Sequence, residues 1–255
     1  MTVTEQYLKI IKPSGYELHA SWFNQGNENL TIICHGGFGD RYEHGRFLAM
    51  AERLAEIEYD TLLFDFSGYG ENERVPIQLP VMVTDLEDVW NWAKQQNYKK
   101  IGTIGLSMGG LVSLCAQIPD RDFAVFWAPG FYLKDSISPF QKFIANIAPK
   151  RLLKKTIKMK QTGAGPPLLF ELSFVDYVLN FDVDQYLRKF SIPFLIIQGT
   201  KDKTVKPEYS EKAFYIMPKD NNHILKMVEG APHDFKGEHL DAFITHTLTF
   251  LTNDF

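Results

Sequence analysis

The chain has 255 residues, of which 45% are hydrophobic, 14% aromatic and 23% charged, as in a globular protein with a substantial core. These proportions exclude disordered and fibrous classes. The formal net charge of −4 gives no overall attraction to nucleic acid or to an anionic membrane, and we expect no nucleic-acid partner. We expect a single domain over residues 1–255.

Targeting and redox signals are few. The start "MTVTEQYLKI" lacks the apolar run of a secretory signal, and no stretch reaches the roughly 20 apolar residues that span a bilayer. We therefore expect a cytoplasmic protein without stable membrane insertion. Cys34 and Cys115 show no metal-binding or CxxC spacing, so we expect two buried thiols and no metal site.

The first predicted elements form a hairpin. Residues 7–11 and 16–23 are rich in strand-forming residues and flank the turn signal Pro13-Ser14-Gly15. The run 30–34 then reads as a buried strand, and "RFLAMAERLAEIEY" has the apolar spacing of an amphipathic helix. The chain is thus expected to begin antiparallel and to continue as strand and helix.

Strands and helices then alternate. We predict strands at 61–66, 100–106, 123–127, 192–199 and 223–228, and helices at 81–95, 108–117, 207–217 and 238–251. Repeated β-α units favour a mostly parallel sheet with helices on both faces. The fold class is therefore α/β.

The alternation stops between Gly130 and about Lys189, where no strand is evident. An insertion of this length is usually a lid or a binding element. We predict a helical cap over about residues 131–189, which we call the cap segment. Its stretch "QKFIANIAPKRLLKKTIKMK" is basic and contains no acid, which is typical of a solvated helix face and also suits anionic substrates or an anionic surface.

The sequence Gly105-Leu106-Ser107-Met108-Gly109 joins a predicted strand to a predicted helix. A G-x-S-x-G motif in this position holds its serine in a sharp turn, with the hydroxyl projecting over the strand ends. Ser107 is therefore the candidate nucleophile. A serine hydroxyl needs a base, and the base needs an acid that fixes its tautomer.

Two later loops supply that base and acid. Asp202 follows the strand in "IIQGTKDKTV", and His233 follows the strand in "VEGAPHDF". Carboxyl ends of parallel strands meet at one edge of the sheet, so both side chains are expected near Ser107. Asp135 is an alternative acid, and Asp234 is expected to be solvated.

The oxyanion of an acyl-transfer intermediate needs two backbone N–H groups. Met108, which follows the nucleophile, would supply one. Gly37, in the loop "HGGFG" after an early strand, would supply the other, with Phe38 as the alternative. His35 is expected to brace this loop.

Taken together, the segments "CHGGFG", "FDFSGYGENE", "GLSMGG", "LIIQGTKDKTV" and "VEGAPHDF" resemble the α/β-hydrolase superfamily. The chain looks most similar to carboxylesterases of the cinnamoyl/feruloyl type and to monoglyceride-lipase-like hydrolases of the serine aminopeptidase S33 type. The resemblance implies a triad of Ser107, Asp202 and His233 and no cofactor. Ser67 stands where these families often have Arg or Asn.

The resemblance implies cleavage of a small carboxylic ester through an acyl-enzyme. A thioesterase and a monoacylglycerol lipase stay open because they would use the same triad, and less favoured alternatives are a peptidase and a non-catalytic ligand-binding protein. A homodimer is also left open. The cap segment offers aromatic side chains that would line an acyl or aryl pocket, namely Phe131, Tyr132, Phe140, Phe174 and Tyr177.

Overall fold

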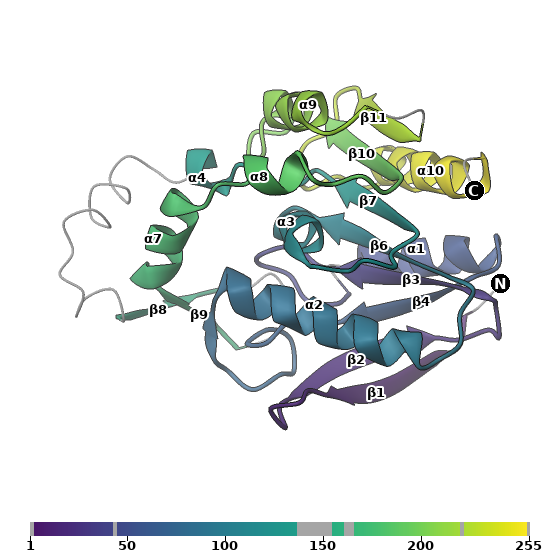
Figure 1. Ribbon diagram of the computed structural model, residues 1–255, viewed down its shortest axis with the longest axis horizontal. Coiled ribbons are helices and arrows are strands. Elements are labelled where there is room, and N and C mark those ends of the chain that lie inside the picture. Colours follow the sequence, from purple (N-terminus) through teal and green to yellow (C-terminus); the bar gives the residue numbers. More distant parts are fainter. Residues whose placement is uncertain (1–2, 43–44, 137–154, 161–165, 220–221, 254–255) are drawn as a thin grey trace.

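The computed structural model describes residues 3–42, 45–136, 155–160, 166–219 and 222–253. Its centre is a sheet of eight described strands in the order β1-β2-β4-β3-β6-β7-β10-β11 (Figure 1). The strands are β1 (Glu5–Ile11), β2 (Glu17–Phe23), β3 (Asn29–Cys34), β4 (Tyr59–Phe64), β6 (Lys100–Leu106), β7 (Phe123–Trp127), β10 (Phe194–Gly199) and β11 (His223–Val228).

The sheet is antiparallel only at its N-terminal side. β1 pairs with β2 and β2 with β4 in antiparallel register, whereas β4, β3, β6, β7, β10 and β11 run parallel. The predicted hairpin and the parallel sheet are therefore confirmed. The fourth strand begins at Tyr59 instead of Thr61, because the left-handed backbone of Glu58 (φ 62°) ends the preceding turn earlier than the apolar pattern suggested.

Helices cover both faces of the sheet. The main ones are α1 (Arg46–Ala55), α2 (Leu79–Lys94), α3 (Met108–Cys115), α9 (Pro207–Ile216) and α10 (Glu238–Asn253). One apolar core joins the sheet to Leu86 of α2, Leu111 of α3 and Ala213 of α9. A second core joins the opposite face to Phe47 of α1 and Phe243 of α10. The sheet is thus the middle of three layers.

Most of the described part of the cap segment lies to one side of these layers (Figure 1), whereas residues 184–187 contact α3 and α9. Its described elements are α4 (Leu133–Ser136), β8 (Thr156–Met159), β9 (Leu168–Glu171), α7 (Leu172–Asn180) and α8 (Asp184–Leu187). The expectation that this segment lacks strands is wrong, because β8 and β9 form a small sheet with β5 (Pro76–Ile77). These strands are only two to four residues long, and β9 pairs with the distant β5 as well as with the nearby β8, so the sequence shows no alternating pattern that would predict them.

The two cysteines and the described helices bear on the expectations about thiols and membrane spans. Cys34 and Cys115 are both buried, as predicted, and burial raises the pKa of each thiol. Among the described helices, none has the length and apolar character needed to cross a bilayer.

Candidate active site

Ser107 occupies the junction between β6 and α3 with a backbone that non-glycine residues rarely adopt (φ 51°, ψ −115°). Hydrogen bonds hold this conformation on both sides. The Ser107 N–H donates to the Trp127 carbonyl at 2.9 Å, and the Ser107 carbonyl accepts from the N–H groups of Gly110 and Gly130 at 3.0 and 2.8 Å. A strained residue persists only where its surroundings fix it, as these bonds do.

The flanking glycines are required by close backbone contacts. A Cβ on Gly105 would lie 2.6 Å from the carbonyl oxygen of Gly109, and one on Gly109 would lie 2.3 Å from that of Cys34. No side chain fits at such distances. The glycines therefore let α3 approach β6 and β3 closely enough to present Ser107 at the end of its strand.

The loop after β3 lies against the first residue of α3. A Cβ on Gly37 would lie 3.0 Å from Met108 Cε and 3.5 Å from Met108 Cβ, so the two proposed oxyanion donors belong to adjoining backbones. The Tyr69 hydroxyl donates to the Gly37 carbonyl at 3.1 Å. Phe38, the alternative donor, carries a ring that is 46% exposed and lies 5.9 Å from the Phe170 ring.

His35 braces this loop, as expected. It is fully buried, its Nδ1 lies 2.7 Å from the Gly36 carbonyl, and its Nε2 accepts from the Phe66 N–H at 3.2 Å. Since Nε2 accepts, Nδ1 carries the hydrogen and donates to Gly36. His35 is thus fixed in the loop by hydrogen bonds at both ring nitrogens.

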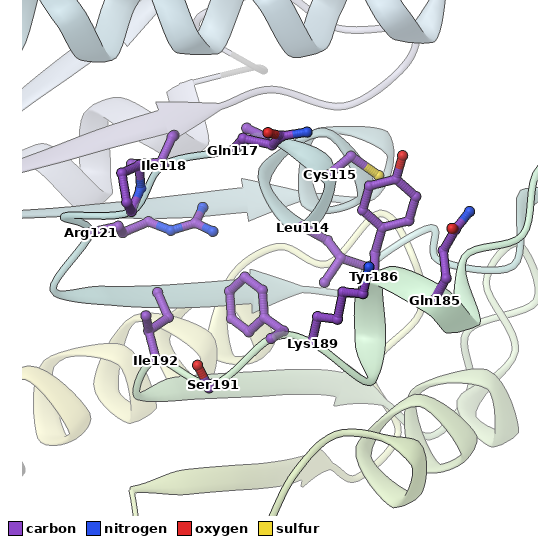
Figure 2. Close-up of a pocket in the computed structure, with 13 residues that line it drawn as sticks. Leu114, Cys115, Gln117, Ile118, Arg121, Gln185, Tyr186, Lys189, Ser191 and Ile192 are labelled. Carbon is purple, nitrogen blue, oxygen red and sulfur yellow. The ribbon is translucent and has the colours of Figure 1, made fainter.

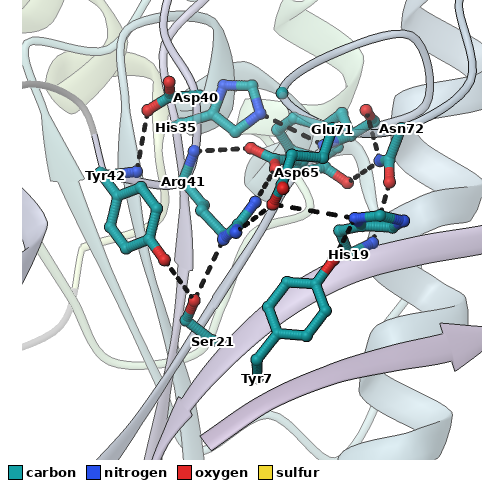
Figure 3. Close-up of polar contacts among 12 residues, drawn as sticks. Tyr7, His19, Ser21, His35, Asp40, Arg41, Tyr42, Asp65, Glu71 and Asn72 are labelled. Carbon is teal, nitrogen blue, oxygen red and sulfur yellow. Dashed lines mark hydrogen bonds and ion pairs between the residues drawn. The ribbon is translucent and has the colours of Figure 1, made fainter. Parts of the chain in front are cut away.

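An ion pair behind the loop fixes its far end (Figure 3). The Arg41 N–H donates to Asp65 Oδ1 at 2.7 Å, and the Arg41 guanidinium pairs with Asp65, with Glu71 at 2.5 Å, and with Ser21 Oγ at 3.0 Å. Burial lowers the pKa of Arg41, but the charge of Asp65 and the hydrogen bond to Glu71 outweigh burial and raise it overall. The network ties the loop after β3 to the loop after β4 and to β2.

The predicted acid and base are hydrogen-bonded to each other. His233 Nδ1 lies 2.7 Å from Asp202 Oδ2, and the Asp202 side chain is fully buried while that of His233 is 22% exposed. The other carboxylate oxygen, Oδ1, accepts from the N–H groups of Thr204 and Val205, both at 2.8 Å. Nδ1 therefore donates to Asp202, which leaves Nε2 of His233 as the basic nitrogen.

The two loops that carry this pair are in contact. A Cβ on Gly199 would lie 2.3 Å from the Ala231 carbonyl oxygen, which also accepts from the Lys201 N–H at 3.1 Å. Both loops follow strands parallel to β6, so they lie at the same sheet edge as Ser107. The contacts of the described residues include no hydrogen bond between Ser107 Oγ and His233; such a bond commonly tightens only in the substrate complex.

Sequence reasoning missed Gln198, which lies in β10 and is fully buried. Its Nε2 donates to Asp202 Oδ2 at 3.1 Å and to the Val205 carbonyl at 3.2 Å, and its Oε1 accepts from Ser210 Oγ at 2.8 Å. Because the carboxylate and the carbonyl only accept, they place the amide nitrogen on the side of Asp202. A polar residue inside the otherwise apolar run "FLIIQG" was the available signal.

The alternative acids lie elsewhere. Asp135 is exposed in α4. Asp234 is 63% exposed, as expected of a solvated side chain; it pairs with Arg46 and Lys236 at 2.8 Å each, and the hydrogen bond from Lys236 lowers its pKa. Within the described part of the chain, no cluster of three or more His, Cys, Asp or Glu side chains could hold a metal ion.

The aromatic residues of the cap segment separate into different environments. Phe131 and Tyr132 are both 2% exposed, and Tyr132 donates to Asp184 Oδ1 at 2.8 Å, so packing accounts for both positions. Phe174 continues a row of rings, since its centroid lies 5.4 Å from that of Phe170. Tyr177 is 39% exposed and stacks on Phe181. Phe140 and much of the basic run lie outside the described residues, whereas residues 155–160 are exposed.

The sheet, the strained serine junction and the loops after β10 and β11 define an α/β-hydrolase fold. Solved structures agree: Est1E from Butyrivibrio proteoclasticus with bound ferulic acid has a TM-score of 0.75 at 20% identity and covers 97% of this chain and 100% of its own. The Pyrococcus furiosus esterase Pf2001 has a TM-score of 0.75 at 22% identity and covers 98% and 90%. The hydrolase GrgF from Penicillium has a TM-score of 0.78 at 17% identity and covers 98% of both chains.

The sequence comparison gives the family. The family described as serine aminopeptidase, S33, matches residues 26–166, and the chain belongs to this family of hydrolases. An uncharacterized 31.7 kDa protein of the traX-finO intergenic region of Escherichia coli is 34% identical over 97 residues, which span 36% of this chain and 33% of the relative. Uncharacterized protein YfhR of Escherichia coli O157:H7 is 24% identical over 234 residues, 90% of this chain and 69% of that relative.

Proposed function

We propose that the chain is a serine hydrolase that cleaves carboxylic esters through an acyl-enzyme. The observation that carries the proposal is the 2.7 Å hydrogen bond between His233 and Asp202, at the sheet edge where Ser107 is held in a strained turn. A histidine held by a carboxylate can activate a serine hydroxyl. The unusual backbone conformation of Ser107 carries strain energy, as is common at active sites.

In the proposed reaction, Ser107 Oγ attacks the ester carbonyl while His233 Nε2 takes its proton. The N–H groups of Gly37 and Met108 hold the oxyanion, and His233 then returns the proton to the leaving alcohol. Water, activated by the same histidine, releases the carboxylic acid. Side chains and water complete these steps, so we propose neither a metal nor an organic cofactor.

The proposed substrate is a small ester with a short acyl or an aryl group. Its support is the row formed by Phe38, Phe170 and Phe174, which begins in the loop beside the proposed oxyanion site. Apolar rings there suit an apolar acyl or hydroxycinnamoyl group. The ferulic acid bound to Est1E is a ligand of that protein and supplies the first compound to test here.

A substrate panel tests the proposal. It contains p-nitrophenyl esters, hydroxycinnamate esters, a monoacylglycerol, an acyl-CoA and an amino-acid p-nitroanilide, so that esterase, lipase, thioesterase and peptidase are compared on one preparation. We expect the esters to be turned over fastest. Preference for the thioester or the anilide would replace the esterase with one of these alternatives.

The nucleophile is tested by labelling with a fluorophosphonate and by Ser107→Ala, with Ser14→Ala in the exposed hairpin turn as the matched control. We expect Ser107→Ala to abolish labelling and to lower kcat by about 10⁴-fold or more, and the control to retain both. Ester turnover that persists in Ser107→Ala would exclude the mechanism. A wild-type protein that neither labels nor hydrolyses any ester would be a binding protein on this fold.

A further inference from the structure

A hollow lies at the C-terminal end of α3, whereas Ser107 precedes the N-terminal end of this helix (Figure 2). It has a volume of about 850 Å³ and is bounded by the C-terminal end of α3, by residues 116–121 and by residues 185–192. A helix of eight residues is about 12 Å long, so this hollow is separate from the candidate active site.

Arg121 lies at the inner side of this hollow and is only 5% exposed. Its Nη1 donates to the Ser113 carbonyl at 2.7 Å, to Ser113 Oγ at 3.0 Å and to Thr103 Oγ1 at 3.3 Å. Its Nε is buried without a hydrogen-bond partner, and no hydrogen bond joins its Nη2 to a described residue. One edge of the guanidinium is therefore unused.

Arg121 also has no carboxylate partner among the described residues. The two acids beside it in the sequence are engaged elsewhere: Asp120 pairs with Lys94 at 3.5 Å, and Asp122 accepts from the Ile101 N–H at 2.7 Å. The Phe190 ring, 5.0 Å from the guanidinium carbon, is a weak substitute. Burial lowers the pKa of Arg121 to about 10, as expected for a buried cation without a counter-ion.

A cation without a counter-ion suits an anionic ligand, and the other residues that line the hollow indicate which kind of anion would fit. Leu114, Ile118 and Ile192 supply apolar surface, and Lys189 adds an exposed cation across from Arg121 (Figure 2). Nη2, which unlike Nε is not among the fully buried atoms, is the donor of Arg121 that remains available to a carboxylate oxygen. Glu87, which accepts from the Gln117 N–H at 2.9 Å, adds negative charge at the rim and disfavours multiply charged anions such as phosphate.

We propose that this hollow binds a small monocarboxylate with an aliphatic or aromatic body, whose carboxylate becomes the counter-ion of Arg121. The carboxylate hydrogen-bonds to Nη2 of Arg121, and the body lies on the apolar wall formed by the end of α3 and the chain before β10. The proposal is independent of the reaction at Ser107.

Calorimetric titration of the whole chain tests the ligand class, with octanoate, octanol and inorganic phosphate as probes. We expect octanoate to bind at least about 10-fold more tightly than either of the others, since one charge-assisted hydrogen bond is worth that much. Equal affinity for octanol, or tighter binding of phosphate, would overturn the proposal.

The position of the ligand is tested by the anomalous signal of bromooctanoate in crystals. A bromine atom between α3 and residues 185–192, with the carboxylate on Arg121, is the expected result. Bromine only beside Ser107 would show that the carboxylate is a ligand of the active site, and the proposal would fail.

Substitutions in and away from the hollow test which residues bind octanoate. Arg121→Met is expected to lower octanoate affinity about 10-fold or more, and Arg121→Lys to restore part of it. Because Arg121 is buried, a surface variant is added: Gln185→Glu should weaken octanoate binding by repulsion without disturbing the fold, and Gln6→Glu, on the distant β1, should not. Unchanged affinity in both Gln185→Glu and a folded Arg121→Met would overturn the proposal.

Discussion

The strand edge that carries the proposed triad and the cap segment differ in how tightly their surroundings hold them. All of β7, whose Trp127 carbonyl accepts from the Ser107 N–H, is buried, whereas all four residues of β8 are exposed. At the strand edge, glycine contacts and backbone hydrogen bonds leave one arrangement available. In the described cap, aromatic rings pack on one another over a small sheet. From this difference we propose that the strand edge carries the chemistry and that the cap segment sets the substrate preference.

The largest expected effects come from the acid and the base. His233→Ala and Asp202→Asn should each lower kcat by about 10⁴-fold with little change in KM, since the first removes the base and the second favours its wrong tautomer. Steady-state kinetics on a p-nitrophenyl ester measure this. Asp234→Asn, one residue from His233, is the matched control and should stay within about 3-fold. A comparable loss in the control would point to Asp234 as the acid.

The next largest effect is expected on the free energy of unfolding, from a substitution of Gly109, two residues after the nucleophile. Gly109→Ala should destabilise the fold by about 3 kcal/mol or more, because its methyl group would meet the Cys34 carbonyl oxygen. Gly15→Ala, where φ is 84° but the space is open, should cost only about 1–2 kcal/mol. Urea unfolding compares the two. Equal losses would show that the strand edge is less constrained than its contacts indicate.

Gln198 should have an intermediate effect on turnover. Gln198→Leu removes a donor to Asp202 and is expected to lower kcat about 10-fold at unchanged KM, whereas Ser210→Ala, which only orients the amide, should cost about 3-fold. A role in packing alone would reduce the melting temperature without this kcat effect, so both quantities are measured on each variant.

The cap segment should affect selectivity more than turnover. Phe174→Ala is expected to lower kcat/KM for hydroxycinnamate esters about 10-fold and for acetate esters less than about 2-fold, because only the larger acyl group reaches the ring. The comparison is Tyr177→Ala, because the ring of Tyr177 stacks on Phe181 instead. This variant should leave kcat/KM unchanged for both kinds of ester. An equal loss for both substrates in Phe174→Ala would contradict a role in acyl selection.

The smallest effect concerns pH. The hydrogen bond from Arg41 lowers the pKa of Glu71, whose ordinary value is 4.5. A depressed folded pKa means that the ion pair stabilises the fold above pH 4.5 and that this contribution disappears as pH falls through the lowered value. Since Glu71 is half exposed, Glu71→Gln should cost less than about 1 kcal/mol at pH 7 and progressively less as the pH falls below 4.5, by urea unfolding.

The sequence by itself determined the parallel sheet, its antiparallel start and the positions of Ser107, Asp202 and His233 at strand ends. Those features rest on local signals: apolar runs, helical periodicity and glycines that permit a sharp turn. Residues whose role depends on a distant partner were decided only by the tertiary structure. In the sequence Gln198 is one polar residue in a strand, and only the structure shows its hydrogen bonds to Asp202 and Ser210. β8 and β9 become strands by pairing with each other, and β9 also pairs with the distant β5.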